Sequence, residues 1–306
     1  MQVTVTVPAT TANLGPGFDC LGLALGLYNQ ITVITSDVPA ARLEVLVTGE
    51  GQGQIPTDEA NLVIRAMETL FARVGKRPFL QQLRQTNHIP VSSGLGSSAA
   101  ATLAGLLAAN ALLANPLSQA DILQLATQME GHPDNVAPAL YGGLTLALTT
   151  KQGVQVTRLP ISPMQVVVVL PDFSLSTAAA RAALPTHVPL ADAVFNVGRM
   201  GLLVHALQAG DYDALAEAMQ DRLHQPYRLP LIPGTTEAFQ AARRAGAAGV
   251  ALSGAGPSLV AFAPGQHETI RTAVINAFRQ VGLTSRSWIL PIVQQGSVVA
   301  VENHEN

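Results

Sequence analysis

The most apolar stretch of this chain, Ala99 to Ala114, directly follows a loop rich in glycine and serine. The stretch is rich in alanine, carries Thr102 and Asn110, and is shorter than the roughly 20 residues that a membrane-spanning helix needs. These features predict a helix buried in the core of a globular protein. The rest of the chain must therefore fold around this helix and leave the glycine-serine loop at its N-terminus.

The loop in front of this helix has the composition of an anion-binding site. A helix N-terminus presents unpaired N–H groups and a partial positive charge, and Gly94 and Gly96 let the backbone approach a ligand closely. We therefore predict that the loop binds a polyphosphate, with a plain serine-capped loop as the alternative. The predicted contacts are Pro90, Val91, Ser92, Ser93, Gly94, Leu95, Gly96, Ser97, Ser98, Ala99 and Ala100.

Other well-known loops and catalytic motifs fit the sequence poorly. A Walker A loop needs a lysine after its last glycine, and the chain has no lysine between Lys76 and Lys151. The segment from Gly94 to Ala99 matches the dinucleotide pattern G-x-G-x-x-A, but the acidic residue expected about 20 positions later is missing. The sequence also lacks the V-A-I-K and H-R-D segments of protein kinases, a G-x-S-x-G hydrolase turn and a zinc-ligand cluster.

Charge and cysteine content limit the partners and the compartment. The formal net charge is −3 and the 17 lysines and arginines are scattered, which argues against nucleic acid and membrane surfaces as partners. A single cysteine, Cys20, cannot form an intramolecular disulfide, and the first residues lack the pattern of a signal peptide. We therefore expect a cytoplasmic protein. Charged residues make up only 12% of the chain, which favours a subunit interface, and we expect a homodimer.

Strand and helix patterns alternate along the chain. The first residues alternate valine with threonine, as in a half-buried strand, which we expect Pro8 to end before a loop over residues 9–18. Residues 61–74 and 118–130 have helical patterns, and residues 164–170 form a continuous apolar run typical of a central strand. The alternation predicts an α+β or α/β protein of two domains.

The motifs of the chain resemble those of one enzyme family. The run P-x-x-x-G-L-G-S-S-A-A at 90–100 resembles the nucleotide loop of GHMP kinases, and LSGAGPS at 252–258 resembles their third motif. PATTANLGPGFDCLG at 8–22 resembles their first motif in the form found in homoserine kinases, and EGHPDNVAP lies at 130–138. Because the similarity spans nearly the full length, the chain is identified as a member of the GHMP kinase family.

The resemblance implies an α+β fold of two domains. These are an N-terminal ribosomal-protein-S5-like domain with the phosphate loop, placed at 1–158, and a C-terminal ferredoxin-like α/β domain that closes the cleft, placed at 159–306. The implied activity is ATP-dependent phosphorylation of the side-chain hydroxyl of L-homoserine to O-phospho-L-homoserine, in threonine biosynthesis, with Mg²⁺. A GHMP kinase for mevalonate, phosphomevalonate or shikimate, and a nucleotide sensor without catalysis, are the alternatives.

The resemblance also implies roles for individual residues. Mg²⁺ is expected at Ser97, with Ser98 as the other candidate, and at Glu130. Two arginines should hold the substrate carboxylate, with Arg222 as a substitute for the second. The expected substrate-binding residues are Asn13, Asp19, Asn135, Arg181, Arg228, Gly254 and Gly256. The residues expected near the reacting hydroxyl are Asn13, Asn135 and Asp134.

Three positions at these motifs need comment. Asp134 and Asn135 are adjacent, and either could face the substrate, so Asp134 is a secondary candidate for a catalytic base. His132 lies between a glycine and a proline, and we expect it to be structural. Gln225 stands where many homoserine kinases have a glutamate before the Pro-Tyr-Arg that ends at Arg228.

Overall fold

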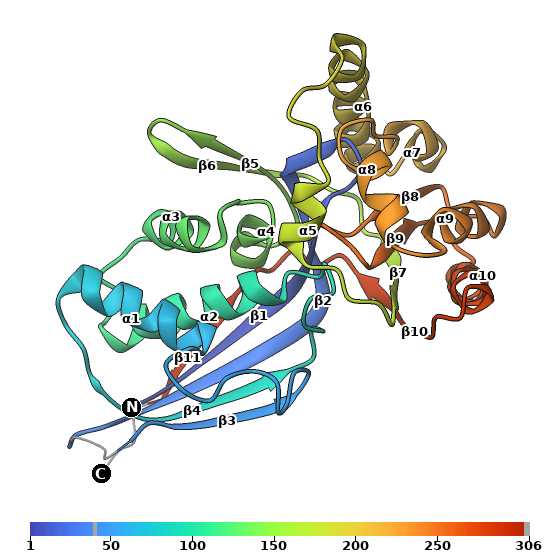
Figure 1. Ribbon diagram of the computed structural model, residues 1–306. Coiled ribbons are helices and arrows are strands. Elements are labelled where there is room, and N and C mark those ends of the chain that lie inside the picture. Colours follow the sequence, from blue (N-terminus) through green and yellow to red (C-terminus); the bar gives the residue numbers. More distant parts are fainter. Residues whose placement is uncertain (39–41, 303–306) are drawn as a thin grey trace.

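Two sheets organise the computed structural model, which describes residues 1–38 and 42–302 (Figure 1). The first sheet contains β1 (Gln2–Asn13), β2 (Gly17–Ser36), β3 (Glu44–Gly49), β4 (Phe79–Asn87), β5 (Leu144–Thr150), β6 (Gly153–Leu159) and β11 (Val298–Glu302). The second contains β7 (Gln165–Pro171), β8 (Gly249–Leu252), β9 (Leu259–Phe262) and β10 (Ser285–Pro291). The helices are α1 (Leu62–Val74), α2 (Ser97–Leu112), α3 (Gln119–Glu130), α4 (Val136–Tyr141), α5 (Thr177–Ala182), α6 (Leu190–Ala209), α7 (Tyr212–Ala218), α8 (Gln225–Arg228), α9 (Thr235–Arg244) and α10 (His267–Gln280).

Helices α1 to α4 pack on one face of the first sheet, whose strand order is β11-β1-β2-β4-β3, with β5 and β6 continuing from β2 (Figure 1). Helix α2 is buried along nearly its whole length against α1, α3 and β1, which confirms the predicted core helix. Local signals set the neighbouring helix ends. Asn61 caps α1 by accepting from the Val63 N–H, and Ser118 caps α3 by accepting from the Asp121 N–H.

The expected end of the first strand at Pro8 is wrong. Strand β1 continues through Pro8 to Asn13, with shifts of register between Pro8 and Ala9 and between Ala12 and Asn13. Such irregularities let a strand contain a proline, which has no N–H to donate, and they bend the strand. The expected loop over residues 9–18 is therefore mostly strand, and it carries the side chains of the first motif toward the phosphate loop.

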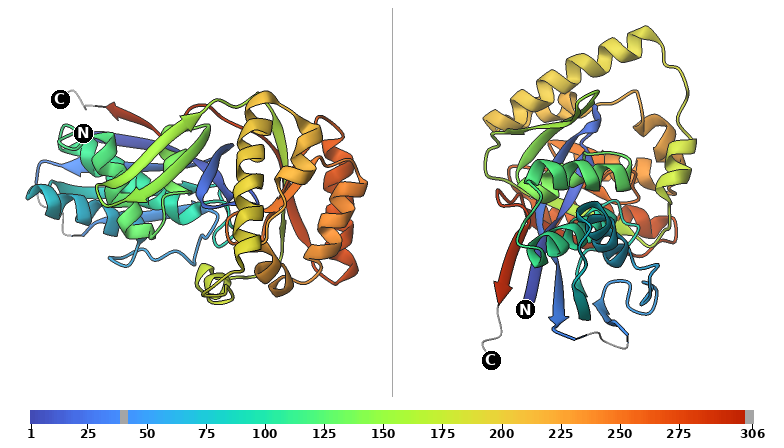
Figure 2. Two further views of the ribbon diagram at one scale, coloured as in Figure 1. Left: turned by 90° about the horizontal axis from the view of Figure 1, so that it is seen from above. Right: turned by 90° about the vertical axis from the view of Figure 1, so that its left-hand side faces the viewer.

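The second sheet has the strand order β10-β7-β9-β8 and is antiparallel throughout. This order, with helices after β7 and β9, is the ferredoxin-like arrangement. Val167 and Val169 of β7 join a core with α9 and α10, whereas Val166 and Val168 join the core that includes α6 and α7. Helices thus cover both faces of the second sheet (Figure 2). Side chains on both sides of the inner strand β7 are buried, which explains why its sequence is a continuous apolar run.

The last strand returns to the first sheet. β11 pairs with β1, with Val301 opposite Val3, and the two strands lie side by side in Figures 1 and 2. The division into residues 1–158 and 159–306 stays a prediction. Hydrogen bonding nevertheless assigns β11, from beyond residue 159, to the sheet of the first half.

Helix α6 is the one helix of the described residues that is long and apolar enough to cross a membrane, judged by length and composition alone. Only 22% of its most apolar 18-residue window is buried. However, Asp192 and Arg199 of α6 form ion pairs with Arg222 and Glu217 of the segment that follows. These contacts hold α6 against α7 and the segment after it, so we describe α6 as a surface helix.

Candidate active site

Three motifs that are distant in sequence meet at one cleft of about 430 Å³, a size typical of small-molecule sites. Backbone hydrogen bonds join them directly. Thr10 N donates to Leu95 O at 3.1 Å, which links the first motif to the phosphate loop. Gly254 N donates to Ala12 O at 3.1 Å, which links the third motif to the first. The fold thus forms the cleft from residues of both halves of the chain.

The phosphate loop forms the N-terminus of α2, as predicted. Gly96 is the residue before the first turn and adopts φ 72°, and no side chain of the described residues caps the helix there. The first-turn N–H groups therefore stay free to bind an anion. A Cβ on Gly96 would lie 2.0 Å from Thr10 Oγ1, and one on Gly94 would lie 2.3 Å from Ser253 O. Both positions require glycine, because the loop is packed tightly between the first and third motifs.

Part of the predicted loop lines the cleft and part supports it. The loop residues that line the cleft are Val91, Ser92, Ser93, Gly94, Gly96, Ser97 and Ser98. Pro90, Leu95, Ala99 and Ala100 are buried beneath it. Their side chains anchor the loop, whereas any contact of Ala99 with a ligand would come from its backbone.

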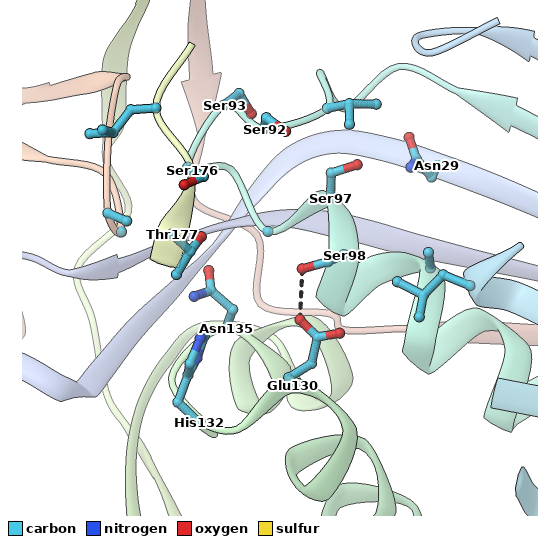
Figure 3. Close-up of a pocket in the computed structure, with 18 of the residues that line it drawn as sticks. Asn29, Ser92, Ser93, Ser97, Ser98, Glu130, His132, Asn135, Ser176 and Thr177 are labelled. Carbon is cyan, nitrogen blue, oxygen red and sulfur yellow. Dashed lines mark hydrogen bonds between the residues drawn. The ribbon is translucent and has the colours of Figure 1, made fainter. Parts of the chain in front are cut away.

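Glu130, at the end of α3, meets the start of α2. Its carboxylate accepts from Ser98 Oγ at 2.6 Å and from Thr102 Oγ1 at 2.7 Å. Figure 3 shows the Ser98 hydroxyl facing Glu130, whereas the Ser97 hydroxyl points away. Ser97 stays a predicted ligand, but the pair that could share a cation here is Ser98 and Glu130. Hydroxyl and carboxylate oxygens suit Mg²⁺, which takes few protein ligands when phosphate oxygens supply others.

The other end of the cleft carries full charges. Arg181 donates to both oxygens of Asp19, at 2.8 and 3.0 Å, and this hydrogen bonding raises the pKa of Arg181. Asn13 supports the pair, since its Oδ1 accepts from Asp19 N at 2.9 Å and its Nδ2 donates to Gly254 O at 2.7 Å. Both polar groups of Asn13 are used inside the protein, so its position favours a role in orienting Asp19.

Arg228 lies beside this pair and is almost fully buried, with 2% of its surface exposed. Its guanidinium lies 5.1 Å from the centre of the Phe18 ring and makes only long hydrogen bonds, of 3.3 to 3.4 Å, to Ala180 O, His224 and Gly254 O. No carboxylate of residues 1–38 or 42–302 forms an ion pair with it. Burial, and next the charge of Arg181, lower the pKa of Arg228. The group is thus a buried cation available to an anion.

Arg222 and Gln225, the two other residues that the sequence analysis discussed with Arg228, lie in different parts of the structure. Arg222 donates to Asp192 at 3.1 Å and stacks on Phe195, outside the cleft lining, so its position does not favour it as a substitute for Arg228. The Oε1 of Gln225 accepts from Leu252 N at 2.9 Å. Gln225 therefore supports strand β8 and the third motif, rather than Arg228 itself.

Asp134 and Asn135 both line the cleft. Thr10 Oγ1 donates to Asn135 Oδ1 at 2.8 Å, so the amide group turns its Nδ2 toward Asp134 Oδ1, 3.3 Å away. The same Asp134 oxygen accepts from His132 Nδ1 at 2.7 Å, and this hydrogen bond raises the pKa of His132. His132, which we expected to be structural, also lines the cleft (Figure 3).

Several lining residues were missed by the sequence analysis. Ser176 and Thr177 begin α5 on one side of the phosphate loop, and Asn29 lies on the other side (Figure 3). Buried polar side chains extend the cleft beyond Asn29, namely Asn61, Gln85 and Asn87, with apolar Ile55 and Pro56 near the predicted Val91. Asn61 could have been noticed as a helix cap, but no sequence signal brings residues of β2, β4 and α1 together.

Comparison with known proteins agrees with this geometry. The family model for the GHMP kinases N terminal domain matches residues 61–143, and that for the GHMP kinases C terminal domain matches residues 203–281. A protein from Moorella thermoacetica named homoserine kinase is 47% identical over 296 residues, which cover 96% of this chain and 99% of the relative. The chain belongs to the GHMP kinase family.

Solved structures of GHMP kinases show the same architecture. The crystal structure of homoserine kinase from Cytophaga hutchinsonii superposes with a TM-score of 0.87 at 33% identity, covering 98% of this chain and 97% of that one. A mevalonate kinase from L. major has a TM-score of 0.72 at 18% identity, covering 95% and 96%, and shows the shared fold alone. The family and the fold expected from the sequence are both confirmed.

Proposed function

We propose that the chain is an ATP-dependent kinase that phosphorylates the side-chain hydroxyl of L-homoserine, a step of threonine biosynthesis. One observation carries the proposal. A buried Arg228 without an ion-pair partner among the described residues lies beside the Asp19–Arg181 pair. The same cleft contains the N-terminus of α2, which no side chain of those residues caps. An α-amino acid and a polyphosphate are the ligands that these two ends would bind together. The relatives named homoserine kinase, at 43–47% identity over nearly the whole chain, support the same substrate.

The substrate would exchange partners with the existing ion pair. Asp19 and Arg181 pair with each other in the cleft. A zwitterionic amino acid can offer its ammonium to Asp19 and its carboxylate to Arg181 and Arg228, so both charges stay paired and Arg228 gains an anion. Mevalonate and shikimate offer a carboxylate but no ammonium, so Asp19 would lose its cationic partner, and a neutral sugar offers neither group. The arrangement therefore favours an amino acid over these acceptors.

The nucleotide would occupy the rest of the cleft. The N–H groups at the start of α2 would bind the phosphates, and the arm lined by Ile55, Pro56 and Val91 offers apolar surface for the base. We propose Ser98 and Glu130 as the protein ligands of Mg²⁺, in place of Ser97 and Glu130. When bound, the ion would neutralise charge on the transferring phosphoryl group.

The residues near the acceptor hydroxyl would mainly position it. Because Asn135 Oδ1 is held by Thr10, the amide presents an N–H donor and cannot take a proton. Phosphoryl transfer has a loose transition state, so positioning and electrostatic stabilisation can suffice, with the proton passing to the phosphoryl oxygens. Asp134 stays the candidate for a base, since only one of its oxygens is used by His132 and Asn135.

The test is ADP release by the purified protein with Mg-ATP and a panel of L-homoserine, mevalonate, shikimate and galactose. We expect turnover with homoserine, and an Arg228→Ala variant should lose affinity mainly through a higher homoserine KM. Turnover with another acceptor would keep the fold and refute the substrate. ATP binding without turnover on any acceptor would favour a sensor.

We also propose that the protein is a homodimer in the cytoplasm. Leu190, Val194 and Val197 of α6 are exposed on one side of the helix, and Gly198 and Gly201 leave open space beside them. Small residues let two helices approach closely, so a second copy could pack against this face across a twofold axis. Light scattering on the wild type and on Val197→Glu tests this; a monomeric wild type would refute it.

A further inference from the structure

His224 is the one histidine of the described residues with no exposed surface, and the proposed mechanism does not use it. It lies in the segment just before α8, four residues before Arg228. Its ring stacks on Phe18 at a centroid distance of 5.0 Å and an interplanar angle of 19°. The same Phe18 ring faces the guanidinium groups of Arg228 and Arg181. A buried titratable group thus shares an aromatic neighbour with both predicted carboxylate-binding arginines.

The hydrogen bonds of His224 determine its tautomer. Nε2 lies 2.7 Å from Gly15 O, and a carbonyl oxygen can only accept, so Nε2 must carry the hydrogen. In the neutral ring Nδ1 then has a free lone pair. Arg228 Nη1 donates to this nitrogen at 3.3 Å. The first motif therefore fixes, through Gly15, which nitrogen of His224 can receive the arginine.

We propose that His224 is a positioning residue for substrate binding: its neutral ring, with Nδ1 as acceptor, holds the Arg228 guanidinium in the orientation that receives the homoserine carboxylate. The inference rests on the carboxylate-binding role proposed for Arg228. The other contacts of that guanidinium are longer still, at 3.4 Å to Ala180 O and Gly254 O. Without the contact to His224, the Arg228 guanidinium would keep only these two longer hydrogen bonds.

Protonation of His224 would reverse this contact. An Nδ1–H would face the Arg228 guanidinium, so a donor and a positive charge would meet another donor and positive charge. The charged groups around the ring are Arg228 on α8, Asp19 on β2 and Asp221 in the preceding turn. Asp221 Oδ2 is 3.5 Å from Nε2, but the Asp221 carboxylate already accepts from Asn196 Nδ2 and three backbone N–H groups.

Burial, the largest influence, lowers the pKa of His224 below its ordinary value of 6.5. The ring is therefore neutral at neutral pH and gains its proton only as the pH falls below that value. The carboxylate and ammonium of an α-amino acid do not titrate in this range. We expect the homoserine KM of the wild type, measured at saturating Mg-ATP, to rise as the pH falls through the acid range.

Two amide substitutions separate the contacts of His224. In His224→Asn the amide oxygen can take the place of Nδ1 and accept from Arg228, whereas in His224→Gln the amide nitrogen can take the place of Nε2 and donate to Gly15 O. For His224→Gln we expect the homoserine KM to rise by about 10-fold or more, with kcat and the ATP KM changed less than about 3-fold. His224→Asn should raise the homoserine KM less than His224→Gln does. In both variants the homoserine KM should no longer rise at acid pH. His205→Gln, on the exposed side of α6, is the matched control and should behave as the wild type.

A measurement on the wild type covers the case in which the variants do not fold. NMR of protein with ¹⁵N-labelled histidine should show one buried ring in the Nε2–H tautomer at neutral pH. An Nδ1–H tautomer, or a homoserine KM with no acid-side increase, would overturn the proposal. If Arg228→Ala raises the homoserine KM and a folded His224→Gln does not, this inference fails and the proposed function stands. If neither substitution raises it, the carboxylate-binding role of Arg228 fails as well.

Discussion

The two ends of the cleft would bind their proposed ligands in different ways. At the phosphate end, one continuous segment at the start of α2 offers backbone N–H groups and carries no cationic side chain. At the amino-acid end, Asp19, Arg181 and Arg228 come from β2, α5 and α8, and they carry full charges. The first end depends on backbone conformation and the second on side-chain placement across the fold.

This difference predicts how each end responds to mutation. A backbone site is disrupted by changes that add a side chain, because every substitution except proline keeps its N–H groups. A charged site is disrupted by changes that remove a side chain. Changes at the phosphate end should lower kcat or weaken ATP binding, whereas changes at the amino-acid end should raise the homoserine KM and leave ATP binding intact.

The largest effect is expected for Gly96→Ala. The new Cβ would lie 2.0 Å from Thr10 Oγ1, in a residue held at φ 72°. We expect kcat/KM for ATP to fall by about 100-fold or more, from displacement of the phosphate loop. Gly75→Ala is the matched control, because Gly75 has φ 73° with nothing within 4 Å of an added Cβ. It should cost about 1 kcal/mol of stability and leave the kinetics unchanged. Equal kinetic losses in both variants would contradict the steric argument.

A second effect should distinguish the two loop serines. Ser98→Ala removes the hydroxyl that donates to Glu130, and we expect kcat to fall by about 10- to 100-fold with a weaker response to Mg²⁺. Ser97→Ala should change kcat by less than about 3-fold, because its hydroxyl points away from Glu130 (Figure 3). Titration of Mg²⁺ at fixed ATP measures both. A larger loss in Ser97→Ala would restore the original assignment of the metal ligand.

At the amino-acid end, Asp19→Asn and Arg181→Met should each raise the homoserine KM by about 10-fold or more, with little change in the ATP KM. Because the two residues form one ion pair, the double variant should show less than the sum of the single effects in free energy. Arg222→Met removes an arginine whose ion pair with Asp192 lies outside the cleft, and should leave both KM values unchanged. Additive effects of Asp19 and Arg181 would show that they do not act as a pair.

The smallest effect concerns stability and pH. The hydrogen bond to Asp134 raises the pKa of His132 above 6.5 in the folded protein. The stability from this interaction is therefore fully present below pH 6.5 and is lost as the pH rises through the folded pKa. Relative to the wild type, His132→Gln should be less stable by about 1 kcal/mol at pH 6, and the difference should shrink toward pH 9. Denaturant unfolding at several pH values measures this, and a constant difference would refute it.

The sequence alone determined the parts that depend on neighbouring residues. Helices α1 and α3 begin within one residue of their predicted starts, because the caps at Asn61 and Ser118 and the apolar periodicity are local. Helix α2 begins at Ser97, two residues before the predicted start at Ala99, and no side chain of the described residues caps it. The phosphate loop was predictable for the same reason, since glycines followed by a helix already define an anion site. The motifs at both ends of the chain were sufficient for the family.

Only the tertiary structure decided which side chains meet. Ser97 and Ser98 are equivalent in sequence, but adjacent helical residues point in directions about 100° apart, and the packing of α3 on α2 brings Glu130 to Ser98. The choice of Arg228 over Arg222, the pairing of Asp19 with Arg181 and the return of β11 to β1 likewise join segments distant in the chain. Local periodicity carries no information about such contacts, because they are selected by the packing of whole sheets and helices against one another.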